Sequence, residues 1–185
     1  MMTVTHGLAE PGIDQALNGE IPAQAAAPVR GAAILVRTVL PRPPSDMAAA
    51  ITRGVRRMMA EHGQQGIVEF CLANGRRADL LCLSDKGEVT IVEVKSSVAD
   101  FQADHKWQDY LEFCDRFYFA VSDEFPQELI PAECGLIVAD AFGAEILRNG
   151  SVASLPGARR KTLMVRIAQA AMARLHRVED PARGL

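Results

Sequence analysis

Three short apolar runs follow one another between residues 66 and 95, and the turns that join them leave little choice of fold. The runs read GIVEFCL, RADLLCLS and EVTIVEVK, and each has the length and the β-branched or aromatic content of a strand. The connections ANGR and DKG contain the residues that favour tight hairpin turns. Because such short connections join antiparallel neighbours, the sequence predicts three antiparallel strands in a row.

Helical patterns flank these strands. Residues 45–62 predict a first helix, capped by Ser45 or Asp46 and carrying an apolar stripe. Residues 96–115 predict a second helix, and the aromatic run at 116–123 predicts a strand that returns to the sheet. Two more strands and a last helix are predicted over residues 134–140, 143–150 and 159–178. The order helix–strand–strand–strand–helix–strand predicts an α/β (α+β) domain, a mixed sheet flanked by helices.

The chain is predicted to hold one folded domain. Residues 1–44 are rich in Ala, Pro and Gly and are interpreted as a flexible extension, residues 45–178 as the domain, and residues 179–185 as a tail. The start of the chain lacks the pattern of a signal peptide, and AAILV at 32–36 is too short to span a bilayer. We therefore expect a cytoplasmic protein without membrane contact.

Composition narrows the classes of site. The chain is 49% hydrophobic with a formal net charge of −3, which fits a globular protein and still permits a local basic face for nucleic acid. No two cysteines form a CxxC pair, so buried reduced thiols are expected instead of a zinc or iron–sulfur site; the cysteines are Cys71, Cys82, Cys114 and Cys134.

One group of charged residues interrupts the apolar runs. Glu93 and Lys95 are two positions apart in TIVEVKSS, so on a strand they project from the same face. Thirteen residues separate Asp79 from Glu93, a spacing that lets a hairpin bring the two carboxylates together. Carboxylates that lie so close repel unless a proton or a cation sits between them, and hard oxygen ligands suit Mg²⁺ or Mn²⁺. The group is interpreted as half of a metal site for phosphodiester hydrolysis.

These residues resemble the signature of the PD-(D/E)XK nuclease superfamily, an aspartate on one strand followed by an acid-x-Lys triplet on the next. The sequence is similar in particular to the MmcB-like bacterial DNA repair proteins, through stretches that cover roughly residues 47–177. Those stretches read RGVRRMM, RRADLLCL, IVEVKSS, DHKWQDYLEFCDRFYFAV and RRKTLMVRIAQAAMARL. The resemblance implies a restriction endonuclease-like core and a role in DNA repair.

The resemblance also implies roles for individual residues. Asp79 and Glu93 would bind the metal with help from the Val94 carbonyl, and Lys95 would position or activate the attacking water. Relatives often add a further acid, for which Glu69 is preferred here to Glu61 because a glutamate inside GIVEF needs a partner if it is covered. On the second helix, Lys106 and Tyr110 fit the spacing of the family's Gln-x-x-x-Tyr pattern, although position 106 is lysine.

The expected function is that of a Mg²⁺- or Mn²⁺-dependent DNA nuclease in repair, with DNA held by arginines. The DNA-binding residues expected are Arg53, Arg57, Arg76, Arg77, Lys106 and Tyr110. Other repair proteins and a second copy of the chain are possible partners. Two other functions stay open, a catalytically inactive DNA-binding or scaffold protein and an interaction module. Individually, Glu93 and Lys95 also fit an exposed ion pair, and Trp107 and Tyr110 fit either base stacking or core packing, the latter being preferred.

Overall fold

The computed structural model describes residues 45–104 and 106–181. The extension predicted over 1–44 and residues 182–185 of the predicted tail lie outside the described residues. No helix of the described part of the chain has both the length and the apolar content needed to cross a membrane.

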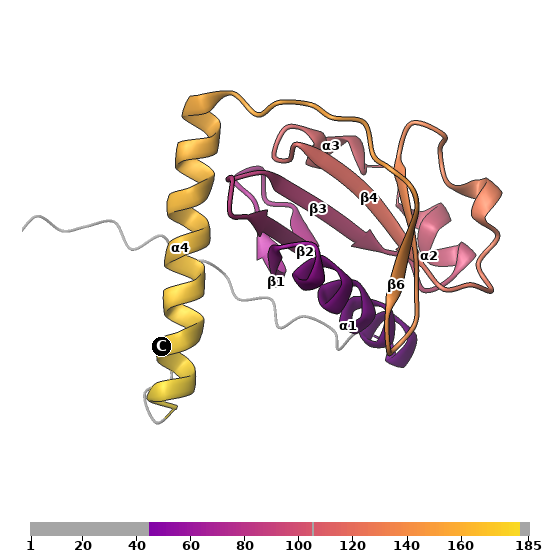
Figure 1. The fold of residues 1–185 in the computed structure, drawn as a ribbon, viewed down its shortest axis with the longest axis horizontal. Coiled ribbons are helices and arrows are strands. Elements are labelled where there is room, and N and C mark those ends of the chain that lie inside the picture. The colour runs from indigo at the N-terminus through magenta and orange to yellow at the C-terminus, as the bar shows by residue number, and fades with distance from the viewer. Residues whose placement is uncertain (1–44, 105, 182–185) are drawn as a thin grey trace, which may run out of the picture. The chain divides into compact units, whose positions relative to one another are not determined.

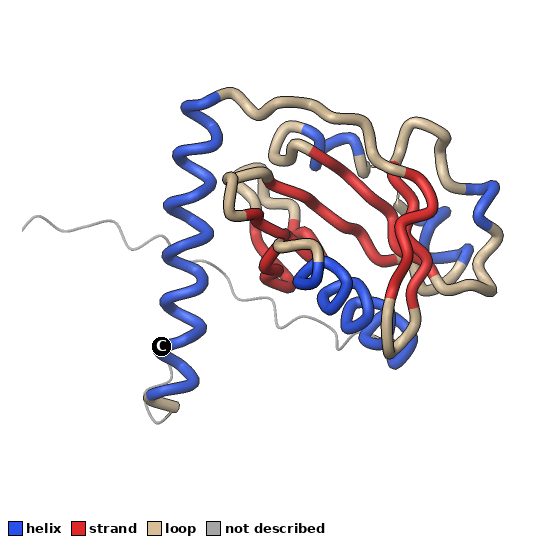
Figure 2. Tube along the Cα trace, viewed as in Figure 1, coloured by secondary structure: helices blue, strands red, loops and turns tan. Residues whose placement is uncertain are grey.

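One six-stranded mixed sheet forms the centre of the domain (Figures 1 and 2). The strands lie side by side in chain order and are β1 (Gln64–Cys71), β2 (Arg77–Ser84), β3 (Val89–Val94), β4 (Arg116–Val121), β5 (Gly135–Ala139) and β6 (Ala144–Arg148). The first three strands pair antiparallel, β4 and β5 run parallel to β3, and β6 returns antiparallel. This confirms the prediction of three antiparallel strands in a row, of a fourth strand that returns to the sheet after a helical segment, and of a mixed α/β fold class.

Helix α1 (Asp46–Glu61) covers one face of this sheet. Its first turn is capped by the Ser45 hydroxyl, which accepts a hydrogen bond from the Ala48 amide at 3.1 Å. The predicted stripe of Ile51, Val55, Met58 and Met59 is buried against inward-facing residues of β2 to β5. At about 25 cal/mol per Å² of buried apolar surface, this contact is a main source of stability for that face.

The opposite face carries an aromatic cluster under the second helical segment. Trp107 stacks on Phe117 with ring centroids 5.6 Å apart, and Phe101 meets Phe119 edge-on at 5.5 Å. The preferred interpretation of Trp107 as a core residue is confirmed. The single helix predicted over 96–115 is wrong, however, because two short helices form instead, α2 (Val98–Ala103) and α3 (Gln108–Leu111).

The break between α2 and α3 lies at Asp104, which has an extended backbone with φ −101° and ψ 99°. Its carboxylate accepts hydrogen bonds from the Lys95 ammonium at 2.6 Å and from the Lys106 amide at 3.1 Å. A short acidic side chain that binds nearby groups offers the backbone an alternative to helix hydrogen bonds, so the helix ends there.

The last helix, α4 (Gly157–Glu179), starts two residues before its predicted limit and buries much less than predicted. Leu163 is buried and Ile167 is partly buried, but Leu175 is 57% exposed. Arg166 and Arg174 donate to backbone carbonyls of β1, so α4 lies along the edge strand. Only its first turns therefore reach the core, and the C-terminal half of the predicted apolar stripe is wrong.

The cysteines follow the prediction at three of four positions. Cys82, Cys114 and Cys134 are buried, and burial raises the pKa of each thiol to about 12. Cys71 is exposed at the end of β1, contrary to the expectation of buried thiols. None of the four cysteines forms a disulfide within the described residues. Separately, a short 3₁₀ helix (Gln127–Leu129) lies between β4 and β5.

A buried carboxylate joins the start of α4 to the sheet. Asp115 is 5% exposed and accepts two hydrogen bonds from the Arg160 guanidinium, both at 2.7 Å. Its oxygens also accept from the amides of Val89 at 2.8 Å and Leu155 at 3.0 Å. Burial alone would raise the pKa of Asp115, but these donors outweigh it and hold the pKa at about 2.

We predict that Asp115→Asn lowers the free energy of unfolding by roughly 2–4 kcal/mol at pH 7, because buried donors lose a charged acceptor. A carboxyl with a lowered pKa stabilises the fold above its ordinary pKa and loses this effect as the pH falls toward about 2. The difference from wild type, measured by urea unfolding, should therefore shrink below about pH 4. Asp123→Asn, on an exposed loop, is the control, and equal losses in both variants would contradict the assignment.

Candidate active site

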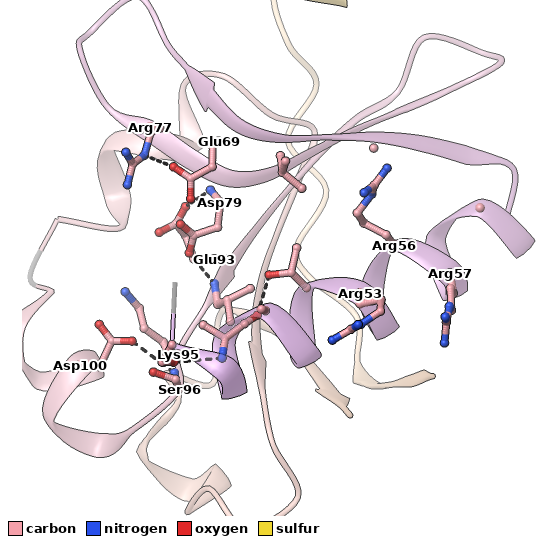
Figure 3. Close-up of a pocket in the computed structure, with 18 of the residues that line it drawn as sticks. Arg53, Arg56, Arg57, Glu69, Arg77, Asp79, Glu93, Lys95, Ser96 and Asp100 are labelled. Carbon is pink, nitrogen blue, oxygen red and sulfur yellow. Dashed lines mark hydrogen bonds and ion pairs between the residues drawn. The ribbon is translucent and has the colours of Figure 1, made fainter. Parts of the chain in front are cut away.

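A cleft of about 1170 Å³ opens between α1 and the ends of the first three strands. Figure 3 shows the carboxylates of Glu69, Asp79 and Glu93 gathered at one end, with Lys95 beside them. The arginines of α1 line the other side of the cleft and are Arg53, Arg56 and Arg57. The acids thus lie at one end of the cleft, accompanied by Lys95 and Arg77, and the α1 arginines lie along its other side.

The register between β2 and β3 brings the two central acids together. Leu80 lies opposite Val92, so Asp79 lies opposite Glu93. The Glu93 Oε1 accepts a hydrogen bond from the Asp79 amide at 3.2 Å, and the Asp79 Oδ2 accepts one from the Val94 amide at 2.8 Å. Each carboxylate is therefore held by the backbone of the neighbouring strand.

Burial perturbs both acids. It raises the pKa of Asp79 to about 6, and it raises the pKa of Glu93 well above its ordinary value, with the Asp79 charge adding to the effect. Glu93 is only 4% exposed. Because Asp79 and Glu93 lie close together with little access to water, their repulsion favours a proton or a cation bound between the two carboxyl groups.

The donor set fits a hard divalent cation. In residues 45–104 and 106–181, no three His, Cys, Asp or Glu side chains are arranged as a ready metal cluster. Mg²⁺ does not require one, because it is usually held by one or two carboxylates and keeps water or substrate phosphate as its other ligands. Asp79 and Glu93 supply such oxygens, and Val94 lines the cleft between Glu93 and Lys95.

Lys95 lies beside the acids but is paired elsewhere. It is 5% exposed, and its Nζ donates to the Asp104 Oδ2 at 2.6 Å. The interpretation of Glu93 and Lys95 as an exposed ion pair is therefore wrong. Burial raises the pKa of Asp104, but the hydrogen bonds from Lys95 and from the Lys106 amide, with the charges of Lys95 and Arg76, together outweigh it, so the net pKa of Asp104 is lowered.

Sequence reasoning did not assign Asp104 to the site. A signal was present, because a covered ammonium needs an anion within reach and Asp104 follows Lys95 on the next helical segment. What the pattern did not reveal was the helix break at Asp104, which turns its carboxylate back toward the strand.

Glu69 lies at the same end of the cleft in an unusual backbone conformation. Its φ is +51°, the one positive φ of a non-glycine residue in the described chain, and such conformations cost about 1–3 kcal/mol. Its carboxylate contacts the Arg77 guanidinium, and its carbonyl accepts a hydrogen bond from Arg174 of α4 at 3.1 Å. Glu61, the alternative acid, is exposed at the end of α1 and does not line the cleft.

The predicted DNA-binding residues separate into two groups. Arg53 and Arg57 line the cleft, and Lys106 is exposed beside α3. Arg76 is bound to Asp109 by two hydrogen bonds, at 2.7 and 2.9 Å, and Arg77 contacts Glu69. Arg56, which was not among the predicted contacts, lines the same cleft from the same face of α1.

Tyr110 does not lie where a DNA contact needs it. The residue is 6% exposed, its ring stacks on Phe117 at 5.9 Å, and its hydroxyl donates to the Arg77 carbonyl at 3.1 Å. Burial, followed by the charges of Glu93 and Asp79, raises the pKa of Tyr110. The listing of Tyr110 as a DNA contact is therefore corrected, and the preferred interpretation of its ring as a core residue is confirmed.

We predict that Asp79→Asn stabilises the protein at pH 7–8 without divalent metal, by roughly 1–3 kcal/mol. An acid with a raised pKa destabilises the fold once it must ionise, so wild-type stability should fall as the pH rises from about 4 to about 6. Thermal unfolding of both proteins across this range measures the effect. Asp85→Asn, in an exposed turn, is the control. A variant less stable than wild type at pH 8 would contradict the assignment.

The chain matches one family model and one solved structure. The family model for "DNA repair protein MmcB-like" matches residues 37–182. Among solved structures, the SPO1766 protein of unknown function from Silicibacter pomeroyi matches with a TM-score of 0.72 and 48% identity, over 75% of this chain and 95% of that one. A search of curated proteins returned no match. The chain belongs to the MmcB-like DNA repair protein family.

Proposed function

We propose that this protein is a Mg²⁺- or Mn²⁺-dependent DNA nuclease that acts in DNA repair. The observation that carries the proposal is the pair of carboxylates formed by the half-buried Asp79 and the buried Glu93, beside the buried Lys95 in an open cleft. Membership of the MmcB-like family points to a role in DNA repair. The proposal of phosphodiester hydrolysis rests on the site residues and not on the family match.

The relation to the PD-(D/E)XK superfamily is part of this proposal. The order α1, β1, β2, β3, α2–α3, β4 resembles the core of that superfamily, with Asp79 on β2 and the triplet Glu93-Val94-Lys95 on and just after β3. Fold kinship alone does not establish cleavage, because related folds carry many functions. The side chains at the site therefore support the activity more directly than the topology does.

Each residue has a role that follows from its position. Asp79 and Glu93 would hold the divalent ion, which when bound supplies Lewis-acid activation of the scissile phosphate and a water. Lys95 would orient the attacking water and offset charge that develops on the phosphate oxygens. Glu69 would hold Arg77 at the rim of the cleft, through the contact between their side chains. The expected products carry a 5′-phosphate and a 3′-hydroxyl.

The arginines of α1 would hold the DNA backbone. Arg53 and Arg56 are exposed and make no ion pair with any carboxylate of residues 45–104 and 106–181. Their charges are therefore available for phosphates. Because phosphate contacts release counterions, binding should weaken steeply with salt.

One observation favours a second function, a nuclease fold that binds DNA or a repair complex without cutting. The Lys95 ammonium is already neutralised by Asp104 at 2.6 Å, and it must leave that carboxylate to act on a water or a phosphate. If the pair stays closed when DNA binds, cleavage does not follow. Partner repair proteins and a homodimer stay predictions.

We predict that purified protein cleaves at least one of single-stranded, nicked or branched DNA in Mg²⁺ or Mn²⁺, and that Lys95→Ala lowers the rate by about 10²-fold or more. Lys95 is the buried cation beside Asp79 and Glu93, so its truncation removes the charge stabilisation assigned to it. Product release from labelled oligonucleotides is the readout. Lys86→Ala, in an exposed turn, should cleave like wild type. Activity that survives in Lys95→Ala would come from a contaminant, and DNA binding without cleavage would establish the second function.

We predict that Arg53→Ala and Arg56→Ala each weaken duplex binding and reduce the slope of log K against log salt by about one. Each variant removes one phosphate contact of the proposed track. Fluorescence anisotropy in EDTA measures binding without cleavage. Arg159→Ala, whose side chain contacts Glu112 on another part of the surface, is the matched control. If the slope of log K against log salt is the same in both variants as in wild type, α1 is not part of the DNA-binding surface.

A further inference from the structure

A largely exposed aromatic side chain lies at the tip of the β5–β6 hairpin. Phe142 is 81% exposed, more than any other large apolar residue that the structure describes as exposed. Burial of a phenylalanine stabilises a protein by about 1.5–3 kcal/mol, and here that gain is not realised. The ring is therefore available to a partner.

The backbone around Phe142 is firmly held. The Asp140 carboxylate accepts hydrogen bonds from the amides of Phe142 at 2.7 Å and Gly143 at 2.9 Å. On α1, Arg57 donates to the carbonyls of Ala141 at 3.0 Å and Phe142 at 3.3 Å. The turn that carries the ring is therefore fixed by hydrogen bonds to the Asp140 carboxylate and to the Arg57 guanidinium.

Helix α1 touches this turn closely. A Cβ at Gly54 would lie 2.2 Å from the Asp140 carbonyl oxygen and 2.3 Å from the Gly143 carbonyl oxygen, so only glycine fits. Arg57 both lines the cleft and holds the turn. The backbone of Phe142 therefore lies beside Arg57, the α1 arginine that Figure 3 shows farthest from the acids, and its exposed ring projects from this turn.

We infer that Phe142 stacks on an unpaired nucleobase of DNA whose phosphates lie on the arginines of α1, so that the protein prefers DNA with single-stranded character. Aromatic side chains beside a basic track are the usual means of binding single strands, because every base has a flat face. In an intact duplex those faces are covered by neighbouring bases, and a ring at the surface meets only sugars and phosphates. The inference rests on the DNA-binding part of the proposed function and not on cleavage.

The test compares a single-stranded oligonucleotide with a blunt duplex of the same sequence, by fluorescence anisotropy in EDTA. Phe142→Ala should weaken single-strand binding about fivefold to 100-fold, as expected for one lost base stack, and should change duplex binding less than twofold. Val152→Ala, which truncates another exposed apolar residue at 65% exposure, should change neither.

A second variant reports the stack directly. Phe142→Trp should keep the single-strand affinity of the wild-type protein, which Phe142→Ala loses. The fluorescence of the new indole should be quenched by the single strand and not by the duplex. The natural protein contains one tryptophan, Trp107, which packs on Phe117 and supplies the background signal. A melting temperature equal to that of wild type confirms that each variant is folded.

The outcomes separate the two proposals. Single-strand binding that is unaffected by Phe142→Ala overturns the stacking inference and leaves DNA binding intact; the ring would then belong to a protein contact. Equal losses for single strand and duplex also overturn it, because a base stack affects only the former. If the wild-type protein binds neither the single strand nor the duplex, both the stacking inference and the proposed nuclease function are overturned. Single-strand binding that is weakened by Phe142→Ala, in a protein that does not cleave DNA, supports the stacking inference and overturns the proposed nuclease activity.

Discussion

The hydrogen-bond ladder between β2 and β3 is the constraint on which the candidate site depends. With Leu80 opposite Val92, Asp79 meets Glu93 and their carboxylates accept from backbone amides across the two strands. A slip of one residue would turn each side chain to the other face of the sheet, beneath α1. Because apolar clusters cover both faces of the sheet, such a slip would also bury the wrong residues, so the register is strongly specified.

Unfavourable features gather at one end of the cleft, whereas the buried carboxylate of Asp115, elsewhere in the core, is well satisfied. Asp115 has four hydrogen-bond donors and a lowered pKa, which is the behaviour of a structural carboxylate. Asp79 and Glu93 instead have raised pKa values, and Glu69 adopts a positive φ. Folding alone gives no reason to retain such costs, and sites for binding or catalysis commonly do retain them.

Much of the fold could be predicted because its signals are local. The turns after β1 and β2, the Ser45 cap and the stripe of α1 each depend on neighbouring residues, and all are found as expected. The proximity of Asp79 to Glu93 followed from strand pairing alone. The break at Asp104 and the exposed end of α4 did not follow, because they depend on which distant groups the chain meets. Tyr110 shows the same limit, since its spacing fits a DNA contact but its ring faces the core.

The sequence by itself determined the three antiparallel strands, the helix before them, and the placing of two acids on adjacent strands with a lysine just after the second, since hydrophobic period and turn chemistry act over a few residues. Only the tertiary structure decided that Lys95 pairs with Asp104, that Arg174 holds the backbone of Glu69, and that Phe142 stands in solvent beside Arg57. Those contacts join residues from 9 to 105 positions apart. Their geometry follows from how the helices pack on the sheet, which no local pattern encodes.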